Sequence, residues 1–176
     1  MGIGDALRSP LVRKLALAFV LSTGGATAII QHEGSPKAPA VNPATHEGKL
    51  NVAYVDPVGI VTICAGHTRT AKLGQLKTDD ECLGLLKEDT RWSERGVKAA
   101  IKVPITQDQY DALTSFAFNV GNAGLLNSTL ARKLNAGDCR GAAAEFPRWN
   151  RAGGRILRGL TKRRLAERTT FEKDCP

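Results

Sequence analysis

The sequence predicts an α+β fold, with a small lobe that carries a β-hairpin, a larger helical lobe, and an active-site cleft between them. Three observations predict it. Apolar and β-branched residues occur on both sides of an Asp-Pro-Val-Gly turn at residues 56–59. Capping signals and helical periodicity then recur over the rest of the chain after residue 78. A chain of 176 residues with 42% hydrophobic and 24% charged content can bury the core that such a fold needs.

The N-terminal residues 1–31 have the pattern of a targeting element. Three basic residues precede an uncharged run at residues 15–31, which is short for a membrane span and is diluted by Ser, Thr and Gly. A cleaved signal peptide, a buried helix and a weak membrane anchor with its positive end inside are the three interpretations. Residues 32–46, which contain several prolines, are expected to be a linker. Residues 47–176 then form the folded domain.

The stretch from Glu47 to Thr68 carries the candidate reactive groups. Residues 50–54 predict a first strand, Asp56 begins a turn, and residues 60–64 predict a second strand. One carboxylate therefore precedes the hairpin and another lies at its turn. A hairpin of this kind can hold two acids on opposite sides of a bound chain.

Two capping boxes predict the starts of helices, at residues 78–81 and 106–109. The first helix should follow a loop at residues 69–77 and run to about residue 100, before Pro104 breaks the chain. The second should end at residues 119–121. We expect the second helix to turn four residues inward: Tyr110, Leu113, Phe116 and Ala117.

The C-terminal part of the chain is predicted to contain a short Ala-rich helix between Gly137 and Pro147 and a basic helix at residues 160–173. The net charge of +8 indicates an anionic partner or surface, such as nucleic acid or the envelope of a bacterium. Basic residues become frequent from Arg148 to Arg168, as on a solvated helix face. No aromatic-rich RNA motif or zinc-finger pattern accompanies them, so nucleic acid is not the expected partner.

The four cysteines lack the CxxC spacing of a zinc site, and the chain has only three histidines, so no metal is expected. Four cysteines allow three pairings, and four free thiols are expected if the chain stays inside the cell. In an oxidising compartment their order favours Cys64–Cys82, which joins the hairpin to the next helix. It also favours Cys139–Cys175, which ties the C-terminal tail to the late helices.

The hairpin stretch resembles the phage lysozymes (endolysins) of glycoside hydrolase family 24. Their motif has a Glu followed by Gly, an Asp separated from that Glu by eight residues, a Thr separated from the Asp by five, and a Gly-His-Thr-like end. Glu47, Asp56 and Thr62 match that spacing without a gap, and Gly66-His67-Thr68 follows. Similar motifs extend the resemblance over roughly residues 45–172; they lie at residues 116–121, 128–130, 148–149, 152–154 and 159–164.

The resemblance implies a lysozyme-like fold and a muramidase that needs no metal or cofactor. It would hydrolyse the β-1,4 bond between N-acetylmuramic acid and N-acetylglucosamine of peptidoglycan and thereby lyse the host cell. Glu47 would be the general acid, with a pKa raised by burial, while Asp56 activates a water held by Thr62 in an inverting reaction. A lytic transglycosylase and a non-catalytic cationic envelope-binding or membrane-disrupting protein are the alternatives. A water-activating pair would be superfluous in a transglycosylase.

The identity of the acid is open, because His-Glu-Gly occurs twice. Glu33 directly follows the apolar N-terminal segment, where the family's acid usually lies, whereas Glu47 has the family's spacing to Asp56. The spacing favours Glu47. Pro43 leaves little more than one helical turn before this residue.

Four further residues are candidate substrate contacts by the same resemblance. Phe118, Asn119 and Gly121 occupy positions where the family's large lobe borders the cleft, although Asn119 would serve equally well as a helix C-cap. His67 completes the set, and a structural hydrogen-bonding role fits it better than catalysis. Gly66 would let the backbone turn closely beneath the site.

The resemblance also favours the membrane-anchor interpretation of the N-terminal segment. Some phage lysozymes carry a signal-anchor-release segment rich in Gly, Ala, Ser and Thr. They are exported while tethered and are freed when the membrane potential collapses. The implied location is the host periplasm, first at the bacterial inner membrane through residues 15–31 and later in solution. A monomer is expected.

Overall fold

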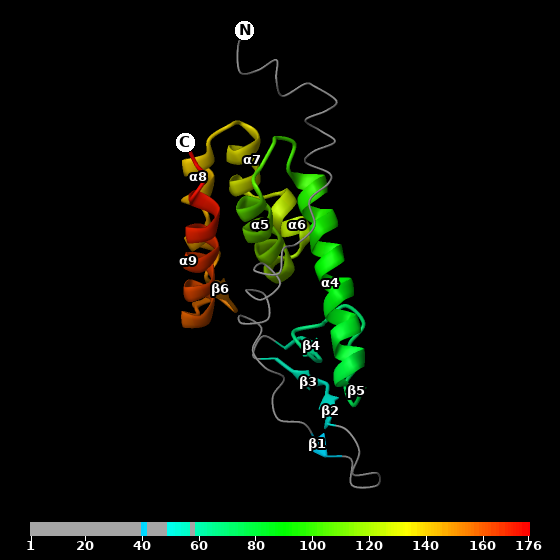
Figure 1. The fold of residues 1–176 in the computed structure, drawn as a ribbon. Helices are drawn as coiled ribbons and strands as arrows, with labels where there is room; N and C mark the ends of the chain where they lie inside the picture. Colours follow the sequence, from blue (N-terminus) through cyan, green and yellow to red (C-terminus); the bar gives the residue numbers. More distant parts are fainter. Residues whose placement is uncertain (1–39, 42–48, 57–58) are drawn as a thin grey trace. The chain divides into compact units, whose positions relative to one another are not determined.

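The structure is a computed structural model and describes residues 40–41, 49–56 and 59–176. The chain divides into two compact units, one over residues 30–91 and one that contains residues 92–176, here called the strand unit and the helical unit (Figure 1). The predicted combination of strands and helices in an α+β fold is confirmed. Glu33, Glu47 and the predicted N-terminal segment lie outside the described residues. Of the predicted linker at residues 32–46, only residues 40–41 are described, and they form a short strand rather than an irregular segment.

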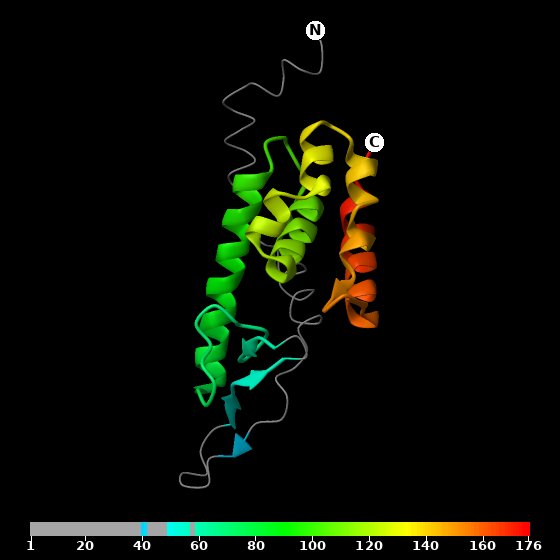
Figure 2. The same cartoon turned by 180° about the vertical axis from the view of Figure 1, so that it is seen from behind.

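The strand unit contains two antiparallel arrangements, visible from both sides in Figures 1 and 2. A three-stranded sheet has the order β1 (Ala40–Val41), β2 (Lys49–Val52), β5 (Leu76–Thr78). A separate hairpin consists of β3 (Tyr54–Val55) and β4 (Val61–Thr62). The predicted hairpin around the Asp56 turn is therefore confirmed.

The predicted first strand at residues 50–54 is divided at Ala53. Its first part pairs with β5, Leu50 lying opposite Thr78, and only its second part pairs with β4. Ala53 itself is buried, and its N–H donates to the carbonyl of Gln75. The expected loop at residues 69–77 is wrong for its last two residues, which lie in β5. Strand formation there depends on the pairing partner rather than on local propensity.

Helix α4 (Asp79–Ala100) contributes its first part to the strand unit and the remainder to the helical unit. The helical unit continues with α5 (Gln107–Val120), α6 (Asn122–Leu126), α7 (Thr129–Asn135), α8 (Cys139–Ala143), the 3-10 segment η1 (Phe146–Trp149), the hairpin β6 (Arg151–Ala152) and β7 (Arg155–Ile156), and α9 (Arg158–Glu172). Within the described residues, none of these helices has the length and apolar character required to cross a bilayer.

Both predicted capping boxes are present. The Thr78 N–H donates to Glu81 Oε2 at 2.8 Å, and the Glu81 N–H donates to Thr78 Oγ1 at 3.2 Å. Thr106 and Gln109 exchange the equivalent bonds at the start of α5. Gly121 ends α5 with a φ of 81°, and its N–H donates to the carbonyl of Ala117, so this glycine and not Asn119 is the C-cap.

The helical unit has an aromatic core centred on Phe116. The Phe116 ring makes edge contacts with Phe146 and Trp149, each with ring centroids 5.3 Å apart, and Phe146 contacts Phe171 at the same separation. The four residues predicted to face inward from α5 are all buried: Tyr110, Leu113, Phe116 and Ala117. The expected core face of this helix is therefore confirmed.

The later helices differ in detail from the prediction. Helices α6 and α7 were not predicted, and the Ala-rich helix ends at Ala143 rather than near Pro147. The proline lies in η1, at a position where a helical turn tolerates the missing N–H. Helix α9 begins two residues before the predicted residue 160.

The expectation of a solvated basic face is wrong for Arg163 and Arg164, which are buried against Glu167. Arg163 Nε lies 3.1 Å from Glu167 Oε1, and Arg164 Nε lies 2.8 Å from Oε2. Ser115 Oγ donates to the same carboxylate at 2.7 Å, and the Arg164 guanidinium lies over the Phe116 ring. Burial raises the pKa of Glu167, and the two guanidinium groups oppose that rise. The countercharge one turn along the helix allows two arginines to be buried.

Candidate functional site

The predicted reactive carboxylate, Asp56, holds the turn of the β3–β4 hairpin. Its Oδ1 accepts the N–H of Ile60 at 2.8 Å, while its own N–H donates to the Ile60 carbonyl at 2.9 Å. Gly59 closes the turn with a φ of 87° and donates to the carbonyl of Asp56. These bonds fix the direction of the carboxylate relative to the hairpin.

Thr62 lies on the second strand of the same hairpin, opposite Tyr54. Its side chain is buried, and its hydroxyl donates to the carbonyl of Ile60 at 3.2 Å. Because Asp56 pairs with Ile60 and side chains alternate between faces, Asp56 and Thr62 are diagonal neighbours on one face. The structure therefore brings together two of the predicted catalytic residues, whereas the two candidate acids, Glu33 and Glu47, lie outside the described residues.

A tight reversal follows Thr62 and brings His67 back beside β4. Ile63 and His67 form an antiparallel bridge around the turn. The turn contains two residues in the left-handed region, Cys64 with a φ of 56° and Gly66 with a φ of 84°. The predicted close turn at Gly66 is therefore present, and it places the imidazole of His67 in the interior of the strand unit.

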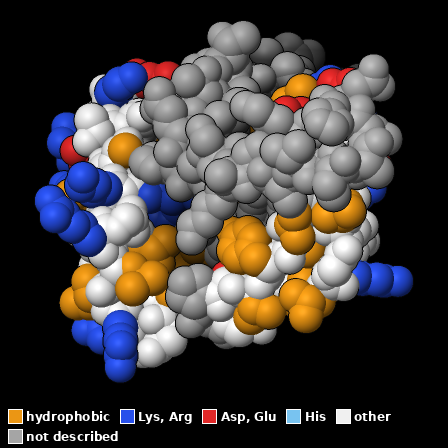
Figure 3. Space-filling view, turned by 90° about the horizontal axis from the view of Figure 1, so that it is seen from below, with side chains coloured by type: hydrophobic (Ala, Val, Ile, Leu, Met, Phe, Trp, Pro, Cys, Tyr) orange, Lys and Arg blue, Asp and Glu red, His pale blue; other side chains and the backbone are white. Residues whose placement is uncertain are grey.

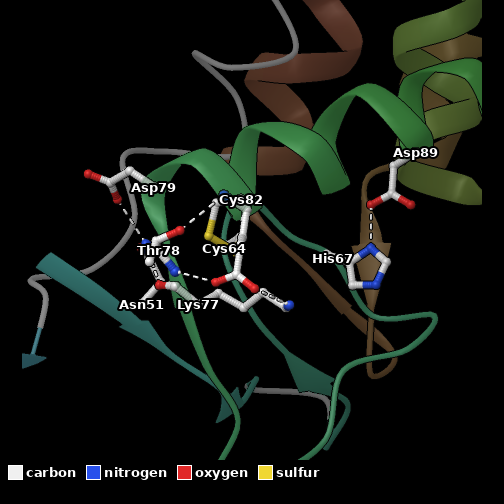
Figure 4. The surroundings of a disulfide bond; sticks show 9 residues. Asn51, Cys64, His67, Lys77, Thr78, Asp79, Cys82 and Asp89 are labelled. Atoms are coloured by element: carbon white, nitrogen blue, oxygen red, sulfur yellow. Dashed lines mark hydrogen bonds and ion pairs between the residues drawn. A yellow bond between two sulfur atoms is a disulfide. The ribbon is translucent and has the colours of Figure 1, made fainter. Parts of the chain in front are cut away.

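The His67 ring is 3% exposed, and both of its nitrogens have partners. Figure 4 shows the contact with Asp89. Nδ1 lies 2.6 Å from Asp89 Oδ2, and Nε2 lies 2.7 Å from the hydroxyl of Thr70. The Thr70 N–H also points to Nε2 at 3.2 Å, so Nε2 accepts and Nδ1 donates to the carboxylate. Arg69 contacts the other oxygen of Asp89. This geometry indicates that His67 positions the loop after the hairpin.

A disulfide and a buried amide attach the strands to the start of α4 (Figure 4). The structure pairs Cys64 with Cys82, the pairing that the cysteine order favours. Asn51 is 3% exposed and donates to Asp79 Oδ1 at 2.9 Å and to the carbonyl of Lys77. Sequence reasoning missed Asn51 and Asp89. The one available signal was a polar residue, Asn51, inside an otherwise apolar strand pattern.

The candidate residues of the helical unit lie at the end of α5. Phe118 is half-buried and Asn119 is exposed. Within the described residues, the Asn119 amide has no hydrogen-bond partner in the fold. Gly121 is also exposed, and its N–H is used in the helix cap. Of the three, Asn119 is therefore the side chain best able to bond a ligand.

The helical unit contains the second disulfide, Cys139–Cys175, again as the cysteine order favours. It joins the start of α8 to the C-terminal tail across 36 residues. Over residues 40–41, 49–56 and 59–176, the structure places no three His, Cys, Asp or Glu side chains close enough together to hold a metal ion.

Comparison with known proteins identifies similar chains and folds. The phage lysozyme family matches residues 44–167. The chain is 42% identical to an endolysin of Acyrthosiphon pisum secondary endosymbiont phage 1, over 72% of this chain and 90% of that protein. It is 37% identical to a SAR-endolysin of bacteriophage PS119, over 91% and 93%. The solved endolysin of Escherichia coli O157:H7 phage FAHEc1 has a TM-score of 0.71 at 30% identity, with 89% and 95% covered.

Proposed function

Since this chain belongs to the phage lysozyme family and is an endolysin with a lysozyme-like fold, we propose that Glu47, Asp56 and Thr62 carry out its reaction. The established part is a muramidase-type glycoside hydrolase that degrades peptidoglycan in host lysis. The proposal adds the residues and the bond, which is the β-1,4 linkage between N-acetylmuramic acid and N-acetylglucosamine.

The proposed reaction divides the chemistry between the two carboxyl groups. Glu47 protonates the glycosidic oxygen, because an alkoxide leaves poorly near neutral pH. Asp56 accepts a proton from a water molecule, and the oxygen of that water attacks the anomeric carbon from the opposite side. One bond to the sugar forms as the other breaks, so the configuration inverts.

The hydrogen bonding of the hairpin supports the roles of Asp56 and Thr62. The Thr62 hydroxyl donates to the Ile60 carbonyl, so its lone pairs remain to accept a hydrogen from water. Asp56 lies on the same face and accepts the other hydrogen. A water molecule held by two acceptors points its own lone pair away from both, toward the substrate. The position of the Asp56 carboxylate and the Thr62 hydroxyl on one face of the hairpin is the observation that carries the proposal.

The remaining predicted contacts take two different roles in the proposal. Phe118, Asn119 and Gly121 are the proposed substrate contacts of the helical unit, and the exposed Asn119 amide bonds a sugar or peptide group of peptidoglycan. His67 acts as a positioning residue, because its ring is buried and both nitrogens are bonded within the fold.

Two substitutions test the choice of acid. Glu47→Gln should lower hydrolysis of purified sacculi by at least about 100-fold, because the general acid is lost while the fold is retained. Glu33→Gln is the matched control and should keep near-normal activity. The opposite result would assign the acid to Glu33. If both variants remain active, the proposed mechanism with a glutamate as general acid is wrong. If the products are 1,6-anhydro sugars without new reducing ends, the enzyme is a transglycosylase.

The proposed location is the host periplasm. The chain divides into three proposed parts: residues 1–31 are an export and anchor segment, residues 32–46 are a linker, and residues 47–176 are a monomeric catalytic domain. The similarity to SAR-endolysins supports export. Residues 15–31 tether the chain to the inner membrane until depolarisation releases it. Fractionation before and after depolarisation should show a shift from membrane to soluble fraction; a mature N-terminus at Ile29 would contradict this by revealing a cleaved signal.

A further inference from the structure

The β6–β7 hairpin and the start of α9 present basic and aliphatic side chains together on the surface of the helical unit. Residues 146–166 contain seven basic residues and no Asp or Glu. Arg163 and Arg164 are buried, and Arg148 pairs with Glu145, so four basic residues remain on the surface. We name the basic–apolar surface by the six residues that form it: Arg151, Arg155, Ile156, Leu157, Arg158 and Lys162.

The charges of this surface are not neutralised within the fold. Across the described part of the chain, none of its four basic side chains lies within ion-pair distance of a carboxylate. The Arg151 guanidinium donates to the carbonyl of Gly154, at 3.3 Å. In the space-filling view of Figure 3, Lys and Arg side chains and hydrophobic side chains lie next to one another along the left edge. A surface of this composition attracts anions.

Two aliphatic residues lie between the basic residues and are open to solvent. Ile156 is 58% exposed and Leu157 is 39% exposed. Leu157 also occupies the N-cap of α9, where Ser, Thr, Asp or Asn would supply a capping hydrogen bond that leucine cannot make. Exposed Ile156 and Leu157 side chains add little to the stability of the fold, and the Leu157 side chain makes no capping hydrogen bond to α9. Both side chains are therefore suited to an apolar partner outside the fold.

The backbone presents these side chains in a fixed arrangement. Gly153 and Gly154 both have positive φ, at 55° and 74°, and form a two-residue hairpin turn that pairs Arg151 with Ile156. On α9, Arg158, Lys162 and the exposed Leu165 follow at i, i+4 and i+7, on the side of the helix away from Arg163, Arg164 and Glu167. Arg151 and Ile156 extend from one face of the hairpin, and Arg155, opposite Ala152, extends from its other face. The end of the hairpin therefore exposes side chains on both faces, and the solvent-facing stripe of α9 follows it directly in the chain.

We propose that the basic–apolar surface docks the helical unit on an anionic phospholipid membrane. The arginines and Lys162 bind lipid phosphates, and Ile156 and Leu157 enter the region between headgroups and acyl chains. A soluble polyanion such as nucleic acid would match the charges but would leave the two aliphatic residues in water. The inference concerns membrane contact and is independent of which residues carry out hydrolysis.

Vesicle binding by the full chain tests this inference. Binding is compared on phosphatidylcholine vesicles and on vesicles in which part of that lipid is replaced by phosphatidylglycerol. In the variant Arg155→Ser, Arg158→Ser, Lys162→Ser, the ratio of binding to anionic over neutral vesicles should fall by about 100-fold, because three surface charges are removed. The preference of the unchanged chain should decrease with added NaCl.

A matched variant separates the surface from the net charge. Lys72→Ser, Lys87→Ser, Arg91→Ser removes the same three charges from exposed residues elsewhere and should retain the anionic preference. The N-terminal segment is identical in both variants, so its contribution cancels. An equal loss in both variants, or no loss in either, would overturn the inference. Unchanged circular dichroism and thermal midpoints establish that both variants are folded.

The aliphatic pair distinguishes a membrane from a soluble polyanion. Ile156→Ser, Leu157→Ser should lower binding to anionic vesicles by about 10-fold, because two apolar side chains no longer enter the bilayer. Binding to soluble dextran sulfate should be unaffected by this change. If the pair has no effect on vesicle binding, the surface is a site for polyanions and the membrane inference is wrong.

Discussion

The two units of this endolysin hold their side chains in place by different means. The helical unit buries an aromatic core in which Phe116 contacts both Phe146 and Trp149. Within the described residues, the strand unit has a core of only four buried residues: Ala53, Ile63, Cys64 and Cys82. Two of these are the halves of a disulfide. The hairpin with Asp56 and Thr62 therefore belongs to the unit with the smaller apolar core.

The strand unit compensates for its small core with covalent and polar connections. The disulfide, the His67–Asp89 contact and the Asn51–Asp79 hydrogen bond all end on α4. Small cores bury too little apolar surface to stabilise a fold alone, and cross-links offset that shortage. The proposed active site therefore depends on a few specific connections, whereas the helical unit depends on collective packing.

The largest expected effect comes from removing the strand-unit disulfide. Replacing Cys64 and Cys82 together by alanine should lower the free energy of unfolding by about 3 kcal/mol, because an 18-residue loop is released in the unfolded chain. Sacculus hydrolysis should be lost on heating before the tryptophan fluorescence of the helical unit changes. Activity and fluorescence are measured against temperature on the same sample.

The second disulfide provides the control for this comparison. Removing Cys139–Cys175 releases a 36-residue loop and should cost a similar free energy. Hydrolysis should nevertheless persist until the whole chain unfolds, because the aromatic core still holds the helical unit. Equal early loss of activity in both variants would mean that the two units are equally dependent on their cross-links.

A smaller effect is expected at His67. His67→Gln should destabilise the chain by about 2 kcal/mol. The shorter amide cannot reach both Asp89 and Thr70, so the largely buried Asp89 loses the hydrogen bond that His67 donates to its Oδ2. Arg69→Gln removes the exposed partner of the same carboxylate and should cost a few tenths of a kcal/mol. Urea unfolding measures both, and equal effects would contradict a buried positioning role for His67.

The sequence predicted the elements that depend on local signals. The two capping boxes, the inward face of α5 and the hairpin turn at Asp56 were all correct. Each is encoded within a few residues, by a side chain that bonds its own backbone or by helical spacing. The turn at Asp56 and the strand that contains Thr62 were predicted for the same reason, whereas their position on one face of the hairpin follows from the observed register.

Features that depend on distant residues were not predicted. The strand at β5 exists because β2 pairs with it, and the burial of Arg163 depends on Ser115, which lies 48 residues away. The partner of His67, Asp89, is on a different element and has no local signal. Such contacts depend on how the chain packs in three dimensions, which a single sequence does not reveal through periodicity or spacing.

An effect smaller than that at His67 is expected in the helical unit, at the largely buried Glu145. Lys133 Nζ lies 2.7 Å from the Glu145 carboxylate, and Arg148 Nη1 lies 3.0 Å from it. The hydrogen bond from Lys133, together with that from Arg148, holds the pKa of Glu145 below its ordinary value of 4.5. The carboxylate therefore stabilises the folded chain above pH 4.5, and this stabilisation is lost as pH falls through the lowered pKa.

Glu145→Gln should accordingly destabilise the chain by about 1 kcal/mol at pH 7 and by progressively less in acid, because the charge-assisted bonds from Lys133 and Arg148 are lost. Urea unfolding at a series of pH values measures the difference. Glu172→Gln, at an exposed pair with Arg168, is the control and should cost less at every pH. If Glu145→Gln lowers the free energy of unfolding more than His67→Gln does, the contrast between the two units is wrong. Polar contacts would then stabilise the helical unit more than they stabilise the strand unit.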